Sequence, residues 1–474
     1  MTFDSAIFLF CFFPVLFVLY RLVRTSAARR ALLLIAGLVF CAFGRLSGVL
    51  WMVAAASVNY LFGLVLMRTE RKKPWRVLAV VLNLAFLGAF KYLDFLAGSI
   101  CPLLGGSWDG LGLAVPAGIS FFTFKGVSYV LDVSRDPSCG SRRYWDVLLY
   151  ISFFPQVMAG PITRFPDFAA QLNQRDDSLG QAARGLRRLT IGLAKKLVFA
   201  AGLGEVADAV FALDAGALSA PLAWLGALAY LLQIYFDFSG YSDMAIGLGR
   251  VFGFETMENF QWPYRASSVG GFWRWWHISL SQWFRDYLYI PLGGSRRGTI
   301  RTGLNKMVVF TLCGLWHGAN WTFVLWGLWH GVLTALEAWQ IIPVRRMEKT
   351  RAGRALGHVY TLLCVCLGFV MFRADSVGQG FSVIGAMFAG GAGSASSALT
   401  LRTLLSGYNI FLLIAGAVCS LPVLPALERR MQAHGEAALR RADGAGYALC
   451  AVLLVLCLTT LAAGGFAPFI YFQF

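Results

Sequence analysis

Charged side chains are scarce in this chain: Asp, Glu, Lys and Arg make up only 14% of its 474 residues, whereas soluble domains carry nearer a quarter. Hydrophobic residues reach 58%, and the mean hydropathy is +0.64. A soluble protein of this composition would expose large apolar surfaces to water. The composition therefore excludes an ordinary soluble domain, and the sequence predicts an all-α protein that crosses a membrane several times.

Acidic residues are scarcer than basic ones, with 24 Asp and Glu against 41 Lys and Arg and a net charge of +17. In a soluble protein this balance would indicate nucleic-acid binding. Here the basic residues gather in short loops between apolar runs, the pattern that orients membrane proteins, so we expect no nucleic-acid partner. The basic segments 21–30 and 68–76 place their loops in the cytoplasm and the N-terminus outside. The first apolar run, 6–20, lacks the flanks of a cleaved signal peptide and is expected to remain as a span.

Metal-binding and disulfide patterns are also missing. The ten cysteines form no CxxC pair and no Cys/His spacing typical of a metal site. Most of them lie in apolar runs, where cysteine behaves as a small hydrophobic residue. We therefore expect neither disulfides nor a metal site, and no bound cofactor.

Apolar runs are what the sequence has in abundance. Several reach the length that a helix needs to cross the hydrocarbon core of a bilayer. We expect about ten to twelve membrane helices, with the runs at roughly 5–22, 31–44, 48–66, 76–97, 115–133, 145–160, 187–212, 220–250, 304–338, 356–373, 406–425 and 446–464.

The segment 255–303 breaks this pattern, because it is aromatic yet carries Arg, Asp, Pro and Gly. Charged, non-helical backbone at membrane depth is tolerated only where protein or a water-filled cavity surrounds it. We expect short, tilted and re-entrant helices that line a funnel open to the cytoplasm, with the basic run 295–301 on that side.

The pentapeptide GLWHG occurs twice, and it places His317 and His330 thirteen residues apart. On one continuous helix this separation gives a rise of about 20 Å and a rotation of about 140°. At most one of the two then lies at a shared reaction centre, unless Gly318 or Gly327 breaks the helix. A structural role is the commoner one for a histidine in an apolar run. An ionisable group in a membrane span is costly, however, and usually faces a cavity, and histidine suits proton transfer near neutral pH.

His277 lies in the aromatic stretch 273–294 and is either a structural hydrogen-bond donor or a group in catalysis or substrate contact, and the polar residues gathered nearby favour the second role. Arg285 and Asp286 nearby could form a buried pair, and in that case their role is structural. Asp237 and Asp243 interrupt the run 220–250. Because they are six residues apart and point in different directions on a helix, a two-carboxylate acid/base pair is disfavoured, and hydrogen bonding between helices is the favoured role.

The C-terminal segment 464–474 is aromatic around Tyr471 and carries no charged side chain. Chain ends are usually polar and disordered. This one is expected either to insert into a groove or to serve as an interfacial aromatic anchor, and the residues alone favour the anchor.

Taken together, these stretches resemble the membrane-bound O-acyltransferase family, in the branch of the bacterial alginate O-acetyltransferases and D-alanyl-lipoteichoic-acid transferases. The motifs that carry the resemblance are SFFPQVMAGPITRF, QIYFDFSGYSDMAIGLGRVFGF, ENFQWPYRASSVGGFWRWWHISLSQWFRDYLYIPLGG and CGLWHGANWTFVLWGLWHG. The resemblance implies one membrane domain, residues 1–474, with a catalytic core at about 115–338. Its helices would form a ring around a thin centre, where a cytoplasmic funnel leads to a histidine and a tunnel leads onward.

The resemblance also implies roles for single residues. The family's central histidine corresponds to His317 and its upstream histidine to His277, whereas His330 has no settled catalytic role. Trp275 stands where relatives usually carry a second arginine, so only Arg274 of that pair is kept, which puts a role for an arginine pair in doubt. The C-terminal segment is similar to an aromatic motif whose tyrosine passes an acyl group to an extracytoplasmic partner, and this favours Tyr471 as a relay.

The resulting expectation is an acyltransferase of the inner membrane that takes an acetyl group from cytoplasmic acyl-CoA, a co-substrate. His317 would act as general base and His277 would orient the site or stabilise the oxyanion. The polysaccharide acceptor would be reached through a partner similar to SGNH hydrolases. Residues expected to contact CoA in the funnel are Arg274, Arg285, Arg296, Arg297 and Arg301, and residues expected to be structural are His330, Asp237, Asp243 and Asp286.

Other functions stay open at this point. D-alanyl transfer to teichoic acid belongs to the same branch. A transporter also uses broken helices with charge at membrane depth, but the chain has no self-similar halves. A scaffold of a polysaccharide export complex would leave the charged segment 255–303 unexplained.

Overall fold

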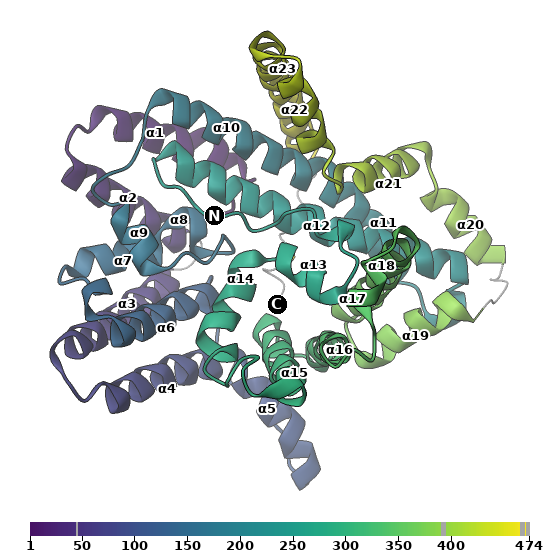
Figure 1. The fold of residues 1–474 in the computed structure, drawn as a ribbon, viewed down its shortest axis with the longest axis horizontal. Coiled ribbons are helices and arrows are strands. Elements are labelled where there is room, and N and C mark those ends of the chain that lie inside the picture. The colour runs from purple at the N-terminus through teal and green to yellow at the C-terminus, as the bar shows by residue number, and fades with distance from the viewer. Residues whose placement is uncertain (44–45, 390–394, 465–469, 471–474) are drawn as a thin grey trace. The chain divides into compact units, whose positions relative to one another are not determined.

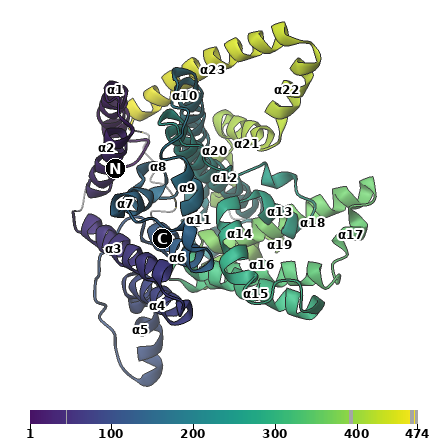
Figure 2. The same ribbon diagram turned by 60° about the vertical axis from the view of Figure 1, so that its left-hand side comes forward.

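The chain is mostly helical in the residues that the computed structural model describes, which are 1–43, 46–389, 395–464 and 470. Within these residues every regular element is a helix and no strand occurs, as Figures 1 and 2 show. The expected all-α class is therefore confirmed. The backbone contacts divide the chain into two units: unit 1 is Met1–Leu189 with Met244–Glu258, and unit 2 is Thr190–Asp243 with Asn259–Phe474.

Unit 1 combines short helices with two long ones, α3 (Leu46–Arg68) and α4 (Lys72–Lys91). In α3 and α4 two buried asparagines face each other, and Asn59 and Asn83 exchange side-chain hydrogen bonds of 3.0 and 2.9 Å. The elements in chain order are η1 (Phe8–Phe12), α1 (Phe13–Leu22), α2 (Ser26–Ala42), α3 (Leu46–Arg68), α4 (Lys72–Lys91), α5 (Leu93–Ile100), η2 (Cys101–Leu104), α6 (Ile119–Arg135), η3 (Pro137–Cys139), α7 (Tyr144–Ser152), α8 (Phe154–Val157), α9 (Phe165–Ala170) and α10 (Leu179–Ala194, of which the last residues belong to unit 2).

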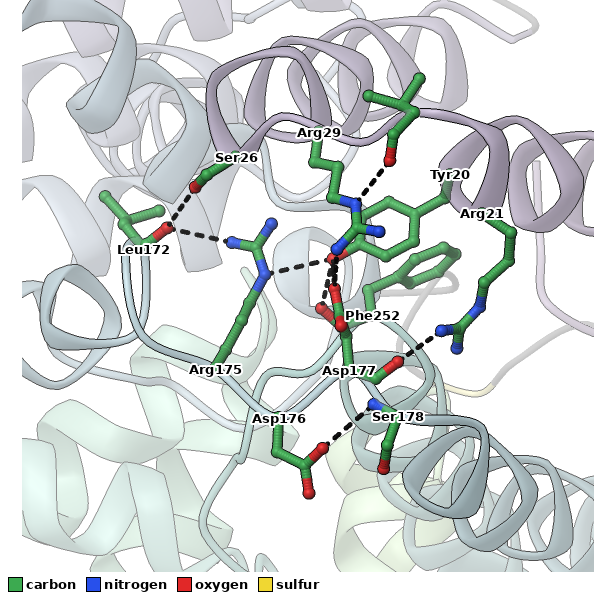
Figure 3. A network of polar contacts seen from close by, with 11 residues as sticks. Tyr20, Arg21, Ser26, Arg29, Leu172, Arg175, Asp176, Asp177, Ser178 and Phe252 are labelled. Carbon is green, nitrogen blue, oxygen red and sulfur yellow. Dashed lines mark hydrogen bonds and ion pairs between the residues drawn. The ribbon is translucent and has the colours of Figure 1, made fainter.

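The basic segment 21–30 of unit 1 is held by a polar network (Figure 3). The Asp177 carboxylate accepts hydrogen bonds from the Tyr20 hydroxyl at 3.0 Å and from Arg29 Nη1 at 2.5 Å. Arg175 Nε in turn donates to the Tyr20 oxygen at 3.1 Å. In the loop before α10, the backbone N–H of Ser178 donates to Asp176 and keeps the pKa of that carboxyl below its usual value. Tyr20 and Arg29 therefore fix α1 and α2 to the loop before α10 through Asp177.

Unit 2 contains the segments in which the candidate residues lie. Its elements are η4 (Lys195–Ala200), α11 (Ala201–Phe211), η5 (Ala215–Ala217), α12 (Ala220–Val251, of which the last turns belong to unit 1), η6 (Pro263–Arg265), α13 (Val269–Trp275), α14 (Ile278–Phe284), η7 (Arg285–Tyr289), α15 (Gly298–His317), α16 (Trp321–Ala338), α17 (Val344–Met347), α18 (Arg351–Arg373), α19 (Val377–Phe388), α20 (Ala395–Leu404), α21 (Gly407–Cys419), α22 (Val423–Ala433) and α23 (Glu436–Ala462).

The two GLWHG motifs lie on the two arms of a helical hairpin, α15 and α16, which run side by side (Figure 1). The helix ends at His317, Gly318 is extended, and Asn320 caps the next helix by accepting the N–H of Thr322 at 3.0 Å. Gly314 and Gly327, the first residues of the two motifs, allow the arms to touch. A Cβ on Gly314 would collide with the carbonyl of Phe323, and one on Gly327 would collide with that of Phe310.

Fewer helices are long and apolar enough to span a membrane than the ten to twelve predicted. Among the described residues five meet both conditions, and the bent pair 397–404 and 407–419 would make six. The five are α3, α4, α12, α18 and α23. The difference arises because several apolar runs are divided in the structure. The run 145–160, for example, becomes α7 and α8, which have nine and four residues.

The segment 255–303 forms short helices, as expected. Before α15 begins, η6, α13, α14 and η7 each have seven residues or fewer. The funnel that these helices are expected to line stays a prediction.

Candidate active site

His277 lies at the junction between α13 and α14, in the left-handed region at φ 43° and ψ 56°. A side chain other than glycine rarely adopts this conformation, and its surroundings must hold it there. Asn259 provides that support. Its carbonyl accepts the N–H of Ile278 at 3.0 Å, its side-chain oxygen accepts the Ser279 hydroxyl at 2.9 Å, and its amide donates to Ser242 of α12 at 3.0 Å.

The His277 imidazole is 1% exposed and lies among aromatic rings. The Phe238 ring of α12 meets it edge-on at 4.6 Å between centroids, and the Trp316 indole lies at 6.2 Å. Neither ring nitrogen has a hydrogen-bond partner among the residues that the structure describes. A buried polar group without a partner is costly, and such groups are frequent where a ligand or a catalytic function supplies the partner.

His317 is the last residue of α15 and is also buried, at 5% exposure. Its ring centroid lies 5.0 Å from that of Trp316, 5.1 Å from that of Trp326 and 5.2 Å from that of Phe372. The Trp316 indole is thus near both His277 and His317. The structure therefore brings the two candidate catalytic histidines to one aromatic cluster, although they are forty residues apart in the sequence.

His330 belongs to the same cluster but has a protein partner. Its Nδ1 accepts a hydrogen bond from the Trp273 indole N–H at 3.3 Å, and its ring lies 5.2 Å from that of Trp326. A nitrogen that accepts this bond carries no proton, so the imidazole is neutral with its proton on Nε2. This contact joins α16 to α13, the helix that leads to His277.

The two aspartates of α12 pair with different lysines. Asp237 lies 2.7 Å from Lys196 with both side chains buried, and Asp243 lies 2.6 Å from Lys195. Asp237 also accepts the backbone N–H of Ile470 at 2.9 Å. The two aspartates thus form hydrogen bonds between helices, as we expected from the sequence. Asp237 in addition binds the C-terminal segment through Ile470. Tyr471 itself lies outside the described residues.

The five candidate arginines are all exposed, unlike the histidines. Arg274 lies in the last turn of α13, Arg285 begins η7, and Arg296, Arg297 and Arg301 lie before and within the first turn of α15. Arg285 bonds Asp286 at 2.7 Å, but its side chain is 57% exposed. The expectation of a buried pair is therefore wrong for the arginine: adjacent residues of a helical turn point in different directions, so Arg285 extends outward while Asp286 stays largely covered.

Sequence reasoning did not identify several residues of this cluster. Phe238 and Trp326 form its walls, Asn259 fixes the turn at His277, and Glu337 binds the backbone of α13. One signal was available for Glu337: it follows His330 by seven residues, or two helical turns, and it is the one acidic residue of the run 304–338. The contacts of Phe238 depend on tertiary packing and left no sequence signal.

Comparison with known proteins identifies the family. Residues 113–376 match MBOAT, the membrane-bound O-acyltransferase family. The chain is 38% identical to the probable alginate O-acetylase AlgI of Azotobacter vinelandii, with both chains covered in full. It is 33% identical to a peptidoglycan O-acetyltransferase of Helicobacter pylori over 82% of this chain and 80% of the relative. A teichoic acid D-alanyltransferase of Bacillus subtilis is 28% identical over 63% of this chain and 82% of the relative. The chain therefore belongs to the membrane-bound O-acyltransferase family and is a multi-pass membrane O-acyltransferase.

Proposed function

We propose that the protein transfers an acetyl group from cytoplasmic acetyl-CoA to hydroxyl groups of an extracytoplasmic polysaccharide. The relatives aligned over the full chain are named as alginate O-acetylases, and a further one as a peptidoglycan O-acetyltransferase. The similarity to the teichoic acid D-alanyltransferase is lower and covers less of the chain. These names support an acetyl group and a polysaccharide of the cell envelope.

The observation that carries the proposal is the pair of buried histidines beside Trp316. His317 acts as general base and accepts the proton of the attacking hydroxyl as its oxygen bonds the thioester carbon. The carbon–sulfur bond then breaks, and His317 returns the proton to the leaving thiolate, which gives free CoA. His277, whose ring nitrogens have no partner among the described residues, donates a hydrogen bond to the oxyanion of the tetrahedral intermediate.

The C-terminal segment supports Tyr471 as the first acceptor. The backbone N–H of Ile470 is bonded to Asp237, and the next residue of α12, Phe238, has its ring against His277. The residue before Tyr471 is therefore attached to the helix that borders the candidate active site. A phenol ester is more activated than an alkyl ester, so the acetyl group on Tyr471 can pass downhill to a sugar hydroxyl.

Three further parts complete the proposal. The exposed basic residues Arg296, Arg297 and Arg301 bind the phosphates of CoA on the cytoplasmic side. An SGNH-hydrolase-like partner outside the membrane takes the acetyl group and esterifies the polysaccharide. The protein lies in the inner membrane with its N-terminus outside the cytoplasm, in the orientation that the basic loops favour.

Acyl labelling tests this function. The purified protein is reconstituted in lipid nanodiscs with acetyl-CoA labelled in the acetyl group, CoA release is measured, and the label is mapped by peptide mass spectrometry. The variants are His317→Ala, Tyr471→Phe and, as a matched control, His434→Ala, which removes an exposed histidine. We expect label on Tyr471 in the wild type and the control, and none in the other two variants.

The other outcomes separate the parts of the proposal. CoA release that depends on His317 without any protein label would keep acetyl transfer and rule out the relay. If no protein variant, the wild type included, releases CoA when an extracytoplasmic acceptor protein is supplied, acyl-CoA is ruled out as the donor. That result would favour the alternative function, D-alanyl transfer.

A further inference from the structure

Glu337 has a place in unit 2 that the proposed mechanism does not use. Its carboxylate, near the end of α16, is buried and accepts two backbone hydrogen bonds from the first turn of α13. The N–H of Val269 donates to Oε1 at 2.7 Å, and the N–H of Gly270 donates to Oε2 at 2.9 Å. The hydroxyl of Tyr360 on α18 lies at 3.4 Å from Oε1. The first N–H groups of a helix have no partner within the helix, so an ionised carboxylate is well matched to them.

A second attachment lies one helical turn further along α13. His330 precedes Glu337 by seven residues, which places both side chains on the same face of α16. His330 binds the Trp273 indole, and Glu337 binds the backbone at 269 and 270. The helix α16 therefore holds α13 at its beginning and near its end.

This attachment bears on His277 because α13 is short. The helix has seven residues, ends at Trp275 and is followed by Trp276 and His277. The Ser281 hydroxyl of α14 donates to the carbonyl of Trp273 at 3.1 Å, so the position of α14 also depends on that of α13. A displacement of α13 along α16 would move the imidazole of His277 relative to Trp316 and His317.

From this geometry we infer that Glu337 is a positioning residue for acyl transfer: its carboxylate clamps the first turn of α13 and thereby sets the place of His277. The inference rests on the role proposed for His277. A glutamine at 337 has one acceptor oxygen in place of two, so one of the two N–H groups would face an amide NH₂ instead. A misplacement of a catalytic group by about 1 Å can cost a hundredfold in rate.

The test compares Glu337→Gln with a matched control, Glu348→Gln. Glu348 is exposed and bonds the Ser267 side chain at 3.1 Å, two residues before Val269. CoA release from labelled acetyl-CoA is measured on the full-length protein in nanodiscs, as a saturating rate and a half-saturating acetyl-CoA concentration. We expect Glu337→Gln to lower the saturating rate by about 10- to 100-fold with the half-saturating concentration within about twofold, and Glu348→Gln to match the wild type.

A double-mutant cycle asks whether Glu337 acts through His277. In a His277→Ala background we expect Glu337→Gln to cause less than about a twofold further loss, because the group that it positions is already gone. A loss of the same factor in both backgrounds would overturn the inference. So would a wild-type rate in Glu337→Gln while His277→Ala is impaired. Wild-type rates in both single variants would overturn the proposed role of His277 as well.

Gly270→Ala keeps the test decisive if Glu337→Gln fails to fold. Among the described residues a Cβ on Gly270 would meet only the Glu337 carboxylate, at 3.0 Å, and alanine favours a helix more than glycine does. The variant therefore disturbs the contact between Glu337 and the first turn of α13 by a change in α13, and it does so without weakening the helix. We expect a lower saturating rate at wild-type thermal stability. A wild-type rate in Gly270→Ala, when Glu337→Gln cannot be purified, would overturn the inference.

Discussion

His317 and His330 contact the same indole, that of Trp326, with centroid distances of 5.1 and 5.2 Å. On one straight helix the two histidines would lie far apart. They meet because α15 ends at His317 and the chain turns back through Gly318 into α16. His330 also accepts a hydrogen bond from the indole N–H of Trp273, at 3.3 Å. The two copies of the pentapeptide therefore lie on the two arms of one hairpin, and their histidines have different contacts.

Replacement of His330 should lower the stability of the protein rather than its rate of acyl transfer. His330→Phe leaves the Trp273 N–H buried without an acceptor, which costs about 1–3 kcal/mol, whereas His330→Gln offers an acceptor and should cost less. Thermal unfolding in nanodiscs measures the difference, and CoA release measures the chemistry. In the same assays His317→Ala should fold normally and lose about 10²–10⁴-fold in rate. A His330→Gln variant as inactive as His317→Ala would contradict this division of roles.

The left-handed backbone at His277 gives a prediction that is independent of catalysis. Glycine adopts φ 43° without steric cost and alanine does not, so His277→Gly should be more stable than His277→Ala by about 1 kcal/mol, although we expect both variants to have a reduced rate of acyl transfer. Gln340 serves as a control position because it also has a positive φ, of 60°, and is exposed. There, too, glycine should exceed alanine in stability, with activity unchanged. Equal thermal stability of the two His277 variants would show that the turn relaxes on substitution.

The helical class and the histidines of the cluster could be predicted from the sequence, whereas the way in which the helices pack around them could not. The apolar runs and the charge in 255–303 predicted short helices there, because charged backbone needs cover at membrane depth. Where α15 turns was left open, since Gly318 and Gly327 were equal candidates on the sequence. The close approach at Gly314 and Gly327 is a property of two helices together. For the same reason the contact between Phe238 and His277, which lie on separate helices, left no pattern in the sequence.

The pair Lys196–Asp237 can be used to separate folding from the binding of the C-terminal segment. Asp237→Leu alone removes the carboxylate facing a buried lysine, at a cost of about 3–5 kcal/mol. The double variant Lys196→Met/Asp237→Leu restores an apolar interior and should recover stability, but it still lacks the acceptor for the Ile470 N–H. We therefore expect wild-type thermal unfolding with reduced acetyl label on Tyr471. The neighbouring pair gives the control, Lys195→Met/Asp243→Leu, which should keep the label. Full labelling in the first double variant would show that Asp237 does not hold the segment.

The exposed arginines before and in the first turn of α15 predict a change in substrate binding alone. Exposed ion pairs contribute about 0.2–1 kcal/mol each, so the triple variant Arg296→Gln/Arg297→Gln/Arg301→Gln should raise the KM for acetyl-CoA by about tenfold at unchanged kcat. Because salt screens exposed charges, the difference from the wild type should shrink as ionic strength rises. The control is Arg345→Gln/Arg346→Gln, which removes two exposed arginines of α17 and should leave KM unaltered. A fall in kcat at constant KM in the triple variant would instead place these arginines with the reacting groups, which are buried.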